Sequence, residues 1–128
     1  MAETEIERIR AMLAARPRPA ALSERRARLD ALGEQFAPPG DVRVEVAQAN
    51  GVAAEWTTTP GADPDQVILF LHGGGYVSGS ILSHRGMVAE AGRQAGARTL
   101  ALGYRLAPEH PYPGALQDAL AGYRFLLS

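Results

Sequence analysis

The chain has 128 residues and a mass of 13.6 kDa, a length that suits one domain. Its 13 basic residues, all arginine, nearly balance 14 acidic ones, and a net charge of −1 excludes the basic surplus typical of nucleic-acid or anionic-membrane binding. The absence of cysteine excludes disulfides, thiolate zinc sites and a cysteine nucleophile. The acidic start and the lack of a long apolar run predict neither a signal peptide nor a membrane span, so we expect a cytoplasmic protein.

Two short amphipathic helices are predicted ahead of the main domain. Apolar side chains recur every three or four positions in residues 5–15, which is typical of one helix face. The run Arg16-Pro17-Arg18-Pro19 ends this helix, because proline lacks an amide donor and disfavours helical geometry before it. Ser23 is a suitable N-cap for the second helix, which ends before Ala37-Pro38-Pro39-Gly40.

Strand patterns follow these helices. Valines alternate with charged residues in 42–46, Asn50-Gly51 is a strong hairpin signal, and residues 52–59 are predicted to form the returning strand. Residues 60–65 are expected to be a loop. The continuous apolar run Val67–Leu71 indicates a strand covered on both faces, as is usual in a parallel sheet.

The rest of the chain alternates between helix and strand, which predicts the α/β class. A glycine-rich loop is followed by a helix over 83–95, a strand over 98–102 and a proline-containing loop over 104–113. Inward positions expected in the first of these helices are Met87, Val88, Ala91 and Ala95; the stripe that predicts a last helix is Leu116, Ala119, Leu120, Tyr123 and Leu127.

The glycine-rich loop, His72-Gly73-Gly74-Gly75-Tyr76, directly follows the apolar strand. Its glycines let the backbone turn sharply and present amide N–H groups to a phosphate or a developing oxyanion, although a plain turn has the same pattern. A dinucleotide site is disfavoured, because the next strand ends in Gly103-Tyr104-Arg105 rather than in an acidic residue. A Walker phosphate loop is excluded, because the chain contains no lysine.

A second motif, Tyr104-Arg105-Leu106-Ala107-Pro108-Glu109-His110-Pro111-Tyr112-Pro113, follows the next strand. Together with the glycine loop it closely resembles the hormone-sensitive-lipase-like esterases of the α/β-hydrolase fold, over roughly residues 40–128. The resemblance implies the N-terminal portion of an α/β-hydrolase, with a mostly parallel sheet whose first two strands are antiparallel. It also implies a helical cap segment at residues 1–40 and an incomplete hydrolase core at 41–128.

The resemblance assigns roles to the residues of the glycine loop. The backbone N–H groups of Gly74 and Gly75 would be oxyanion-hole donors that stabilise a tetrahedral intermediate. Gly73 and His72 would support the loop, His72 through side-chain hydrogen bonds. Tyr76 would line the substrate pocket, although a packed aromatic residue fits the sequence equally well.

The second motif is implied to be structural. Arg105 and Glu109 would form a buried ion pair or hydrogen-bond network that fixes the loop, with a solvated surface pair as the alternative. The Ala107-Pro108 bond is a candidate for the cis form.

The catalytic triad expected of such an esterase is not present in this chain. None of the serines, Ser23, Ser78, Ser80, Ser83 and Ser128, lies in a Gly-x-Ser-x-Gly elbow. His84 and His110 come too early for the base position, and Asp118 lies where the family has a helix before the elbow. A pair of Ser78 and His84 lacks an orienting acid. We therefore expect this chain to be inactive alone, with a second polypeptide or a lost segment carrying the rest of the fold and covering an otherwise open strand edge.

The function implied by the resemblance is hydrolysis of a carboxylic ester of short to medium acyl length, or of a lactone, through an acyl-serine intermediate. No metal or organic cofactor is implied. Two alternatives remain: a non-catalytic binding or assembly module whose glycine loop holds a carboxylate, and the disfavoured nucleotide-binding domain.

Overall fold

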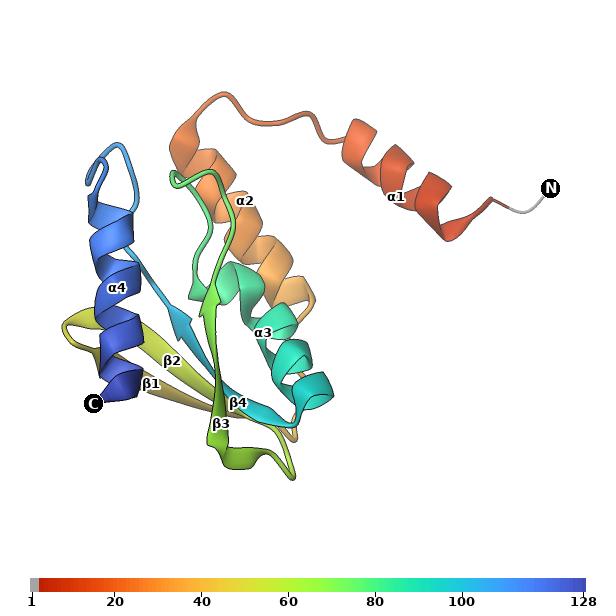
Figure 1. The fold of residues 1–128 in the computed structure, drawn as a ribbon. Coiled ribbons are helices and arrows are strands. Elements are labelled where there is room, and N and C mark those ends of the chain that lie inside the picture. Colours follow the sequence, from red (N-terminus) through yellow and green to blue (C-terminus); the bar gives the residue numbers. More distant parts are fainter. Residues whose placement is uncertain (1–2) are drawn as a thin grey trace.

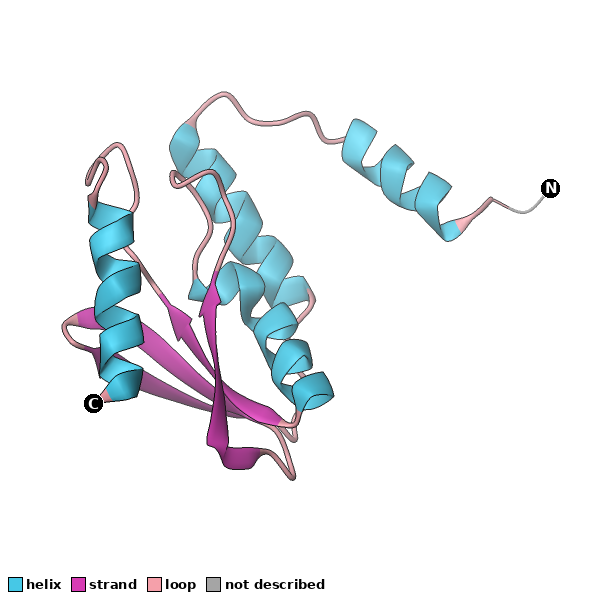
Figure 2. Ribbon diagram, in the orientation of Figure 1, coloured by secondary structure: helices cyan, strands magenta, loops and turns pink. Residues whose placement is uncertain are grey.

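A computed structural model describes residues 3–128 as one four-stranded sheet with helices on both faces (Figures 1 and 2). Helix α4 packs on one face, α3 packs on the other, and α2 packs on the outer side of α3. None of the helices in this range combines the length and apolar character that a membrane crossing requires. In chain order the elements are α1 (Glu5–Ala14), α2 (Leu22–Gln35), β1 (Arg43–Ala49), β2 (Val52–Thr58), β3 (Asp63–Leu71), α3 (Ile81–Ala95), β4 (Ala97–Leu102) and α4 (Gly114–Leu127).

The sheet has the strand order β1-β2-β4-β3 and is mixed. Strands β1 and β2 form the predicted antiparallel hairpin through Asn50 and Gly51, whose φ angles of 51° and 86° are left-handed, as a tight hairpin turn requires. Strand β4 pairs antiparallel with β2 and parallel with β3, and α3 makes the crossover between β3 and β4. The α/β class and the antiparallel first pair are confirmed.

Strand β3 lies at the edge of the described sheet and begins earlier than predicted. It starts at Asp63, inside the expected loop, and its register against β4 shifts between Asp63 and Val67. Because no described strand pairs with its outer side, Val67 and Leu71 remain 37% and 47% exposed. The prediction of a strand covered on both faces is therefore wrong for the described residues, whereas the prediction of an open edge is confirmed.

Several helix details differ from the sequence interpretation. Ala21, not Ser23, is the N-cap of α2 and makes no side-chain cap, whereas Ser80 caps α3 in a reciprocal capping box with Ser83. In α3, Met87 and Ala95 are exposed; the buried residues of this helix are Val88, Ala89 and Gly92.

Helix α4 turns a different face to the core than its apolar stripe suggests. The side chains packed against the core cluster of β1, β2 and β4 are Ala121, Phe125 and Leu126. The large side chains of the predicted stripe are 43–68% exposed; they are Leu116, Leu120, Tyr123 and Leu127. Helical periodicity identified the helix correctly. Because α4 carries apolar residues on more than one face, the periodicity did not show which face packs on the sheet.

The two N-terminal helices are attached to the rest of the fold very differently. Helix α2 approaches α3 so closely that a Cβ on Gly33 would lie 2.2 Å from the carbonyl oxygen of Leu82. Helix α1 has no buried residue and extends away from the sheet (Figure 1). The division of the chain into a cap segment at 1–40 and a core at 41–128 stays a prediction.

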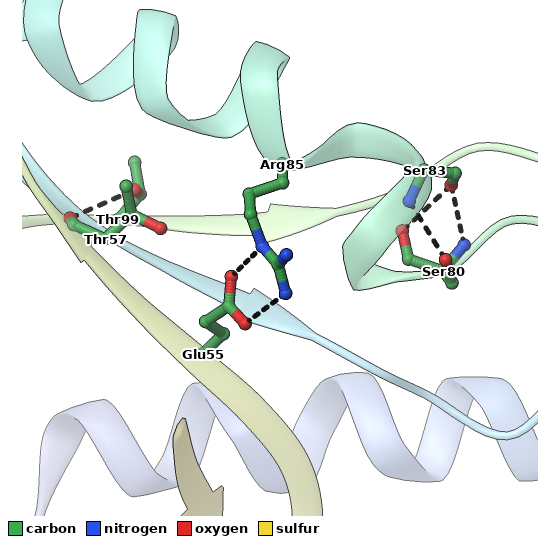
Figure 3. A network of polar contacts seen from close by, with 6 residues as sticks. All are labelled: Glu55, Thr57, Ser80, Ser83, Arg85 and Thr99. Carbon is green, nitrogen blue, oxygen red and sulfur yellow. Dashed lines mark hydrogen bonds and ion pairs between the residues drawn. The ribbon is translucent and has the colours of Figure 1, made fainter. Parts of the chain in front are cut away.

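A buried ion pair fixes α3 on the sheet. Glu55 on β2 is 4% exposed, and both its carboxylate oxygens accept hydrogen bonds of 2.8 Å from the guanidinium of Arg85 on α3 (Figure 3). This contact raises the pKa of Arg85. Figure 3 also shows Thr99, whose hydroxyl donates to the carbonyl of Thr57 at 3.3 Å beneath the same helix.

Removal of Arg85 is expected to destabilise the protein strongly, because it leaves the Glu55 carboxylate buried without a partner. Since Arg85 is partly exposed, we expect Arg85→Met to lower the free energy of unfolding by about 2–3 kcal/mol, less than for a fully buried pair. The matched control is Arg93→Met, which breaks the more exposed pair with Asp41 and should cost clearly less than Arg85→Met, because solvent screens an exposed pair. Urea denaturation measures both, and equal losses would contradict the importance of the buried pair.

Candidate active site

The glycine loop, residues 72–76, leaves the carboxyl end of β3 with a backbone that favours glycine. The φ angles of Gly74, Gly75 and Tyr76 are 138°, 65° and 64°. The carbonyl of Gly74 accepts hydrogen bonds from the hydroxyl of Ser78 at 2.8 Å and from its amide at 3.1 Å. A Cβ on Gly74 would lie only 2.0 Å from the carbonyl oxygen of Ser78, so no other residue fits there without moving the loop.

The amides of Gly73, Gly74, Gly75 and Tyr76 all lack a hydrogen-bond acceptor among residues 3–128, so this loop has amide groups that are free to bind a ligand. Among residues 3–128, no backbone or side-chain acceptor receives a hydrogen bond from the N–H of Gly74 or of Gly75. Gly75 is exposed and Gly74 is half-buried, so this part of the loop is accessible to solvent. Adjacent unpaired amides of this kind can hold a carboxylate or a developing oxyanion.

A cleft of about 730 Å³ opens beside these amides. The glycine loop forms one wall, and the 104–113 loop with the first turns of α4 forms the other. This position, beyond the carboxyl ends of the parallel strands β3 and β4, is where α/β sheets usually bind ligands. The remaining lining residues are mostly apolar or aromatic: Leu71, Tyr104, Ala107, His110, Tyr112, Ala115, Leu116 and Ala119.

His72 is buried beneath the loop. Its ring stacks on that of Tyr104 with centroids 4.2 Å apart, and its Nδ1 lies 2.8 Å from the carbonyl of Gly73, which requires that this nitrogen carry the hydrogen. The Tyr104 hydroxyl donates to the backbone carbonyl of His72. Burial lowers the pKa of His72 more than the contact with Gly73 raises it, and the nearby His84 lowers it further. Burial also raises the pKa of Tyr104.

Tyr76 is 70% exposed at the rim of the cleft, and its carbonyl accepts a hydrogen bond of 2.8 Å from the amide of Ala107. This bond joins the glycine loop to the 104–113 loop. The peptide bond between Ala107 and Pro108 is cis, as is that between Tyr112 and Pro113.

Arg105 and Glu109 do not pair with each other, so that form of the prediction is wrong. Arg105 donates to Asp118 on α4 through its backbone amide at 2.8 Å and its side chain at 2.9–3.1 Å. Glu109 binds Arg26 on α2 at 2.7 Å, which lowers the pKa of Glu109. The resemblance implied a pair between Arg105 and Glu109, but the 104–113 loop directs the two side chains to different helices.

Ser78 and His84 also have different partners. The Ser78 hydroxyl binds the Gly74 carbonyl, whereas Nδ1 of His84 lies 2.8 Å from the hydroxyl of Ser83. The weak candidate for a self-contained serine–histidine pair is therefore not assembled. Within residues 3–128 no three acidic or histidine side chains are grouped as a metal site would need.

Sequence reasoning missed Arg26 and the roles of Ser78 and Asp118 as hydrogen-bond partners. Arg26 contacts Val77, Ala107 and Glu109, which are 51 to 83 residues away in the chain. No local pattern distinguishes Arg26 from Arg25 and Arg28, which lie on the same helix.

Comparison with known proteins agrees with this architecture. A family described as having the α/β-hydrolase fold matches residues 68–128, which include both loops of the cleft. The structure also aligns over 99% of its length with an esterase of the bacterial hormone-sensitive lipase family, with a TM-score of 0.89 and 44% identity. The described residues have the α/β-hydrolase fold over the part of it that they span, and they resemble hormone-sensitive-lipase-family esterases.

Curated relatives of the chain are named as acetyl-hydrolases, esterases or lipases. An acetyl-hydrolase from Streptomyces hygroscopicus is 46% identical over 98 residues, which are 77% of this chain and 31% of the relative. An ethyl acetate hydrolase from Pseudomonas putida is 47% identical over 60 residues, 47% of this chain and 19% of the relative. The chain spans about a third or less of these proteins and 44% of the solved hormone-sensitive-lipase-family esterase.

The buried His72 is expected to make stability depend on pH. Its pKa in the folded state is below the usual value of about 6.5, so the unfolded chain takes up the proton more readily and stability falls as the pH drops through this range. Urea denaturation at pH 7.5 and 5.5 should therefore show a smaller pH-dependent loss for His72→Gln than for the wild type. The exposed His110→Gln is the control and should keep the wild-type loss; an unchanged loss in His72→Gln would contradict the assignment.

Proposed function

We propose that this chain is part of a carboxylic-ester hydrolase and supplies its oxyanion hole. The observation that carries the proposal is the pair of unpaired amides at Gly74 and Gly75 beside an apolar cleft. The esterase names of the relatives support the reaction class. Two of these relatives, the acetyl-hydrolase and the ethyl acetate hydrolase, are named for the small acetyl group. We therefore propose a short-chain ester, or a lactone, as substrate.

The geometry suits one step of this reaction. When a serine hydroxyl attacks an ester carbonyl, the new C–O bond forms as the carbonyl electron pair moves to oxygen, and a base takes the hydroxyl proton. The amides of Gly74 and Gly75 would donate hydrogen bonds to that oxygen, and each such donor contributes about 3–4 kcal/mol in a well-studied hydrolase. Collapse of the intermediate releases the alcohol, which takes the proton, and water then hydrolyses the acyl-serine.

Tyr76 and the apolar side chains of the cleft would contact the substrate. Tyr76 lies at the rim with most of its ring exposed, so a substrate could cover it, whereas Leu116 and Ala119 line the opposite wall. Gly73 and His72 would hold the loop from below through the contact between the His72 ring and the Gly73 carbonyl.

The serine, the acid and the base of the triad would come from further polypeptide, in a second chain or a continuation of the same one. The chain contains no Gly-x-Ser-x-Gly sequence. The open edge of β3 and the exposed apolar stripe of α4 lie next to the cleft and provide surface for such a segment. We also propose that the chain alone does not hydrolyse esters.

A chimaera tests the proposal. In it, this chain replaces the corresponding segment of the Streptomyces hygroscopicus acetyl-hydrolase. We expect hydrolysis of p-nitrophenyl butyrate, and we expect Gly74→Ala to lower kcat about 100-fold, because the Cβ would collide with the Ser78 carbonyl and displace the amide donors. The measurement is steady-state kinetics on the chimaera, its variants and the isolated chain.

The matched control is Gly96→Ala. Gly96 ends α3 with a φ of 63° and has open space around its Cβ position, so alanine there strains the backbone by about 1 kcal/mol without touching the cleft. It should lower stability but leave kcat within threefold. Equal kcat for the two variants would contradict the oxyanion assignment, and turnover by the isolated chain would contradict the proposal that the nucleophile lies elsewhere.

A further inference from the structure

One arginine joins helix α2 to both loops of the cleft. The guanidinium of Arg26, on α2, donates from Nε to the carbonyl of Val77 at 2.7 Å and from Nη2 to the carbonyl of Ala107 at 3.0 Å. The same group binds Glu109 through two hydrogen bonds of 2.7 and 3.2 Å. The Arg26 side chain is 29% exposed, whereas that of Glu109 is 52% exposed.

The carbonyls of Val77 and Ala107 belong to residues that also hydrogen-bond to the glycine loop. Val77 is the first residue after the glycine loop, and its amide donates to the Gly74 carbonyl at 3.3 Å. Ala107 is held on both sides, since its amide donates to the Tyr76 carbonyl and its own carbonyl accepts from Arg26. Arg26, Val77, Tyr76 and Ala107 thus form a closed ring of covalent and hydrogen bonds around the end of the glycine loop.

The helix that carries Arg26 is itself firmly placed. Gly33 lets α2 lie directly against the backbone of α3, and Asp30 accepts a hydrogen bond from the hydroxyl of Ser80, the N-cap of α3. The loop between β3 and α3 is therefore attached at its far end to the same helix that holds Arg26. A rigid planar guanidinium on a fixed helix can set the position of two carbonyls at once.

We propose that Arg26 is a positioning residue for the reaction: it holds the glycine loop in the conformation that presents the amides of Gly74 and Gly75 to the cleft. This inference rests on the proposed function for its catalytic meaning, while its structural part, the ordering of the loop, stands on the hydrogen bonds alone. The contacts that matter are those to the Val77 and Ala107 carbonyls. The ion pair with Glu109 orients the guanidinium but does not touch the loop that carries the amides.

Two substitutions separate these contacts. Arg26→Gln removes all of them, whereas Glu109→Gln removes the ion pair and leaves the arginine able to reach both carbonyls. A simple surface ion pair would make the two variants equivalent. A positioning arginine makes them different.

Amide hydrogen exchange of the 128-residue chain, followed by NMR, measures the order of the loop. The amides of Ala107 and Ser78 report on it, because they donate to the carbonyls of Tyr76 and Gly74. We expect exchange at these two amides to be at least tenfold faster in Arg26→Gln and to stay within threefold of the wild type in Glu109→Gln. Arg26→Lys should also be at least fivefold faster, because an ammonium lacks the planar fork, and it serves if the glutamine variant fails to fold.

A control at a distance excludes a general loss of stability. Arg93→Gln breaks another arginine–carboxylate pair, with Asp41, and should leave exchange at Ala107 and Ser78 within threefold of the wild type. Equal exchange in the Arg26 and Glu109 variants, or faster exchange in Arg93→Gln as well, would overturn the inference.

Kinetics on the esterase chimaera described above distinguish this inference from the proposed function. We expect Arg26→Gln to lower kcat at least tenfold with KM within threefold, and Glu109→Gln to change kcat by less than threefold. If Gly74→Ala lowers kcat and Arg26→Gln does not, the inference is overturned while the proposed function stands. If neither variant lowers kcat, the oxyanion assignment fails and with it the catalytic role of Arg26, whereas the exchange data still decide whether Arg26 orders the loop.

Discussion

The backbone conformation between β3 and α3 is the constraint on which the rest of this structure depends. The chain must leave a strand, turn back over it and enter a helix within a few residues, and it does so through left-handed φ angles at Gly74, Gly75 and Gly79. Two of these glycines also admit close contacts: a Cβ on Gly74 would meet the Ser78 carbonyl, and one on Gly79 would meet the Gly73 carbonyl and the His72 ring. The loop is thus folded onto itself, and the carbonyls of Gly73 and Gly74 accept hydrogen bonds from the side chains of His72 and Ser78.

The surrounding elements keep this loop in place from three directions. His72 and Tyr104 support it from the core by ring stacking, the 104–113 loop holds it from the side through Ala107, and α2 holds it from above through Arg26. Farther away, the buried Glu55–Arg85 pair keeps α3 on the sheet, so the helix that follows the loop has a fixed starting point. The proposed oxyanion donors are backbone amides, so neighbouring residues have to hold them in position.

Local sequence was sufficient for much of the fold. The hairpin at Asn50-Gly51, the apolar strand and the two later helices follow from periodicity and turn chemistry, which act over a few residues. The N-cap of α2 was assigned wrongly. Ser23 is the only residue near the start of this helix with a typical N-cap side chain, but in the structure the helix already begins at Leu22. The inward faces of α3 and α4 depend on how each helix lies on the sheet, and small residues such as Gly92 and Gly122 face inward where a pattern of large apolar residues suggests another side.

The candidate site was predictable only in part, because some of its contacts join residues that are far apart in the sequence. The glycine loop and the 104–113 motif are contiguous and could be found by reading, but the partners of Arg105 and Glu109 could not. Asp118 and Arg26 reach them from helices 13 and 83 residues away, so the pairing depends on tertiary structure. A motif in the sequence shows which residues form the loops of the site. The hydrogen-bond partners of those residues lie on other helices and become visible only in the folded structure.

Helix α1 has little contact with the rest of the fold. It has ten residues, a capping box at Thr4 and Glu7, and an apolar side formed by Ile6, Ile9 and Leu13, yet none of its residues is buried. A helix this short gains little stability from its own hydrogen bonds, because nucleation is costly and only a few turns repay it. A surface that covered Ile6, Ile9 and Leu13 would therefore add to the small stability that the hydrogen bonds of this helix supply.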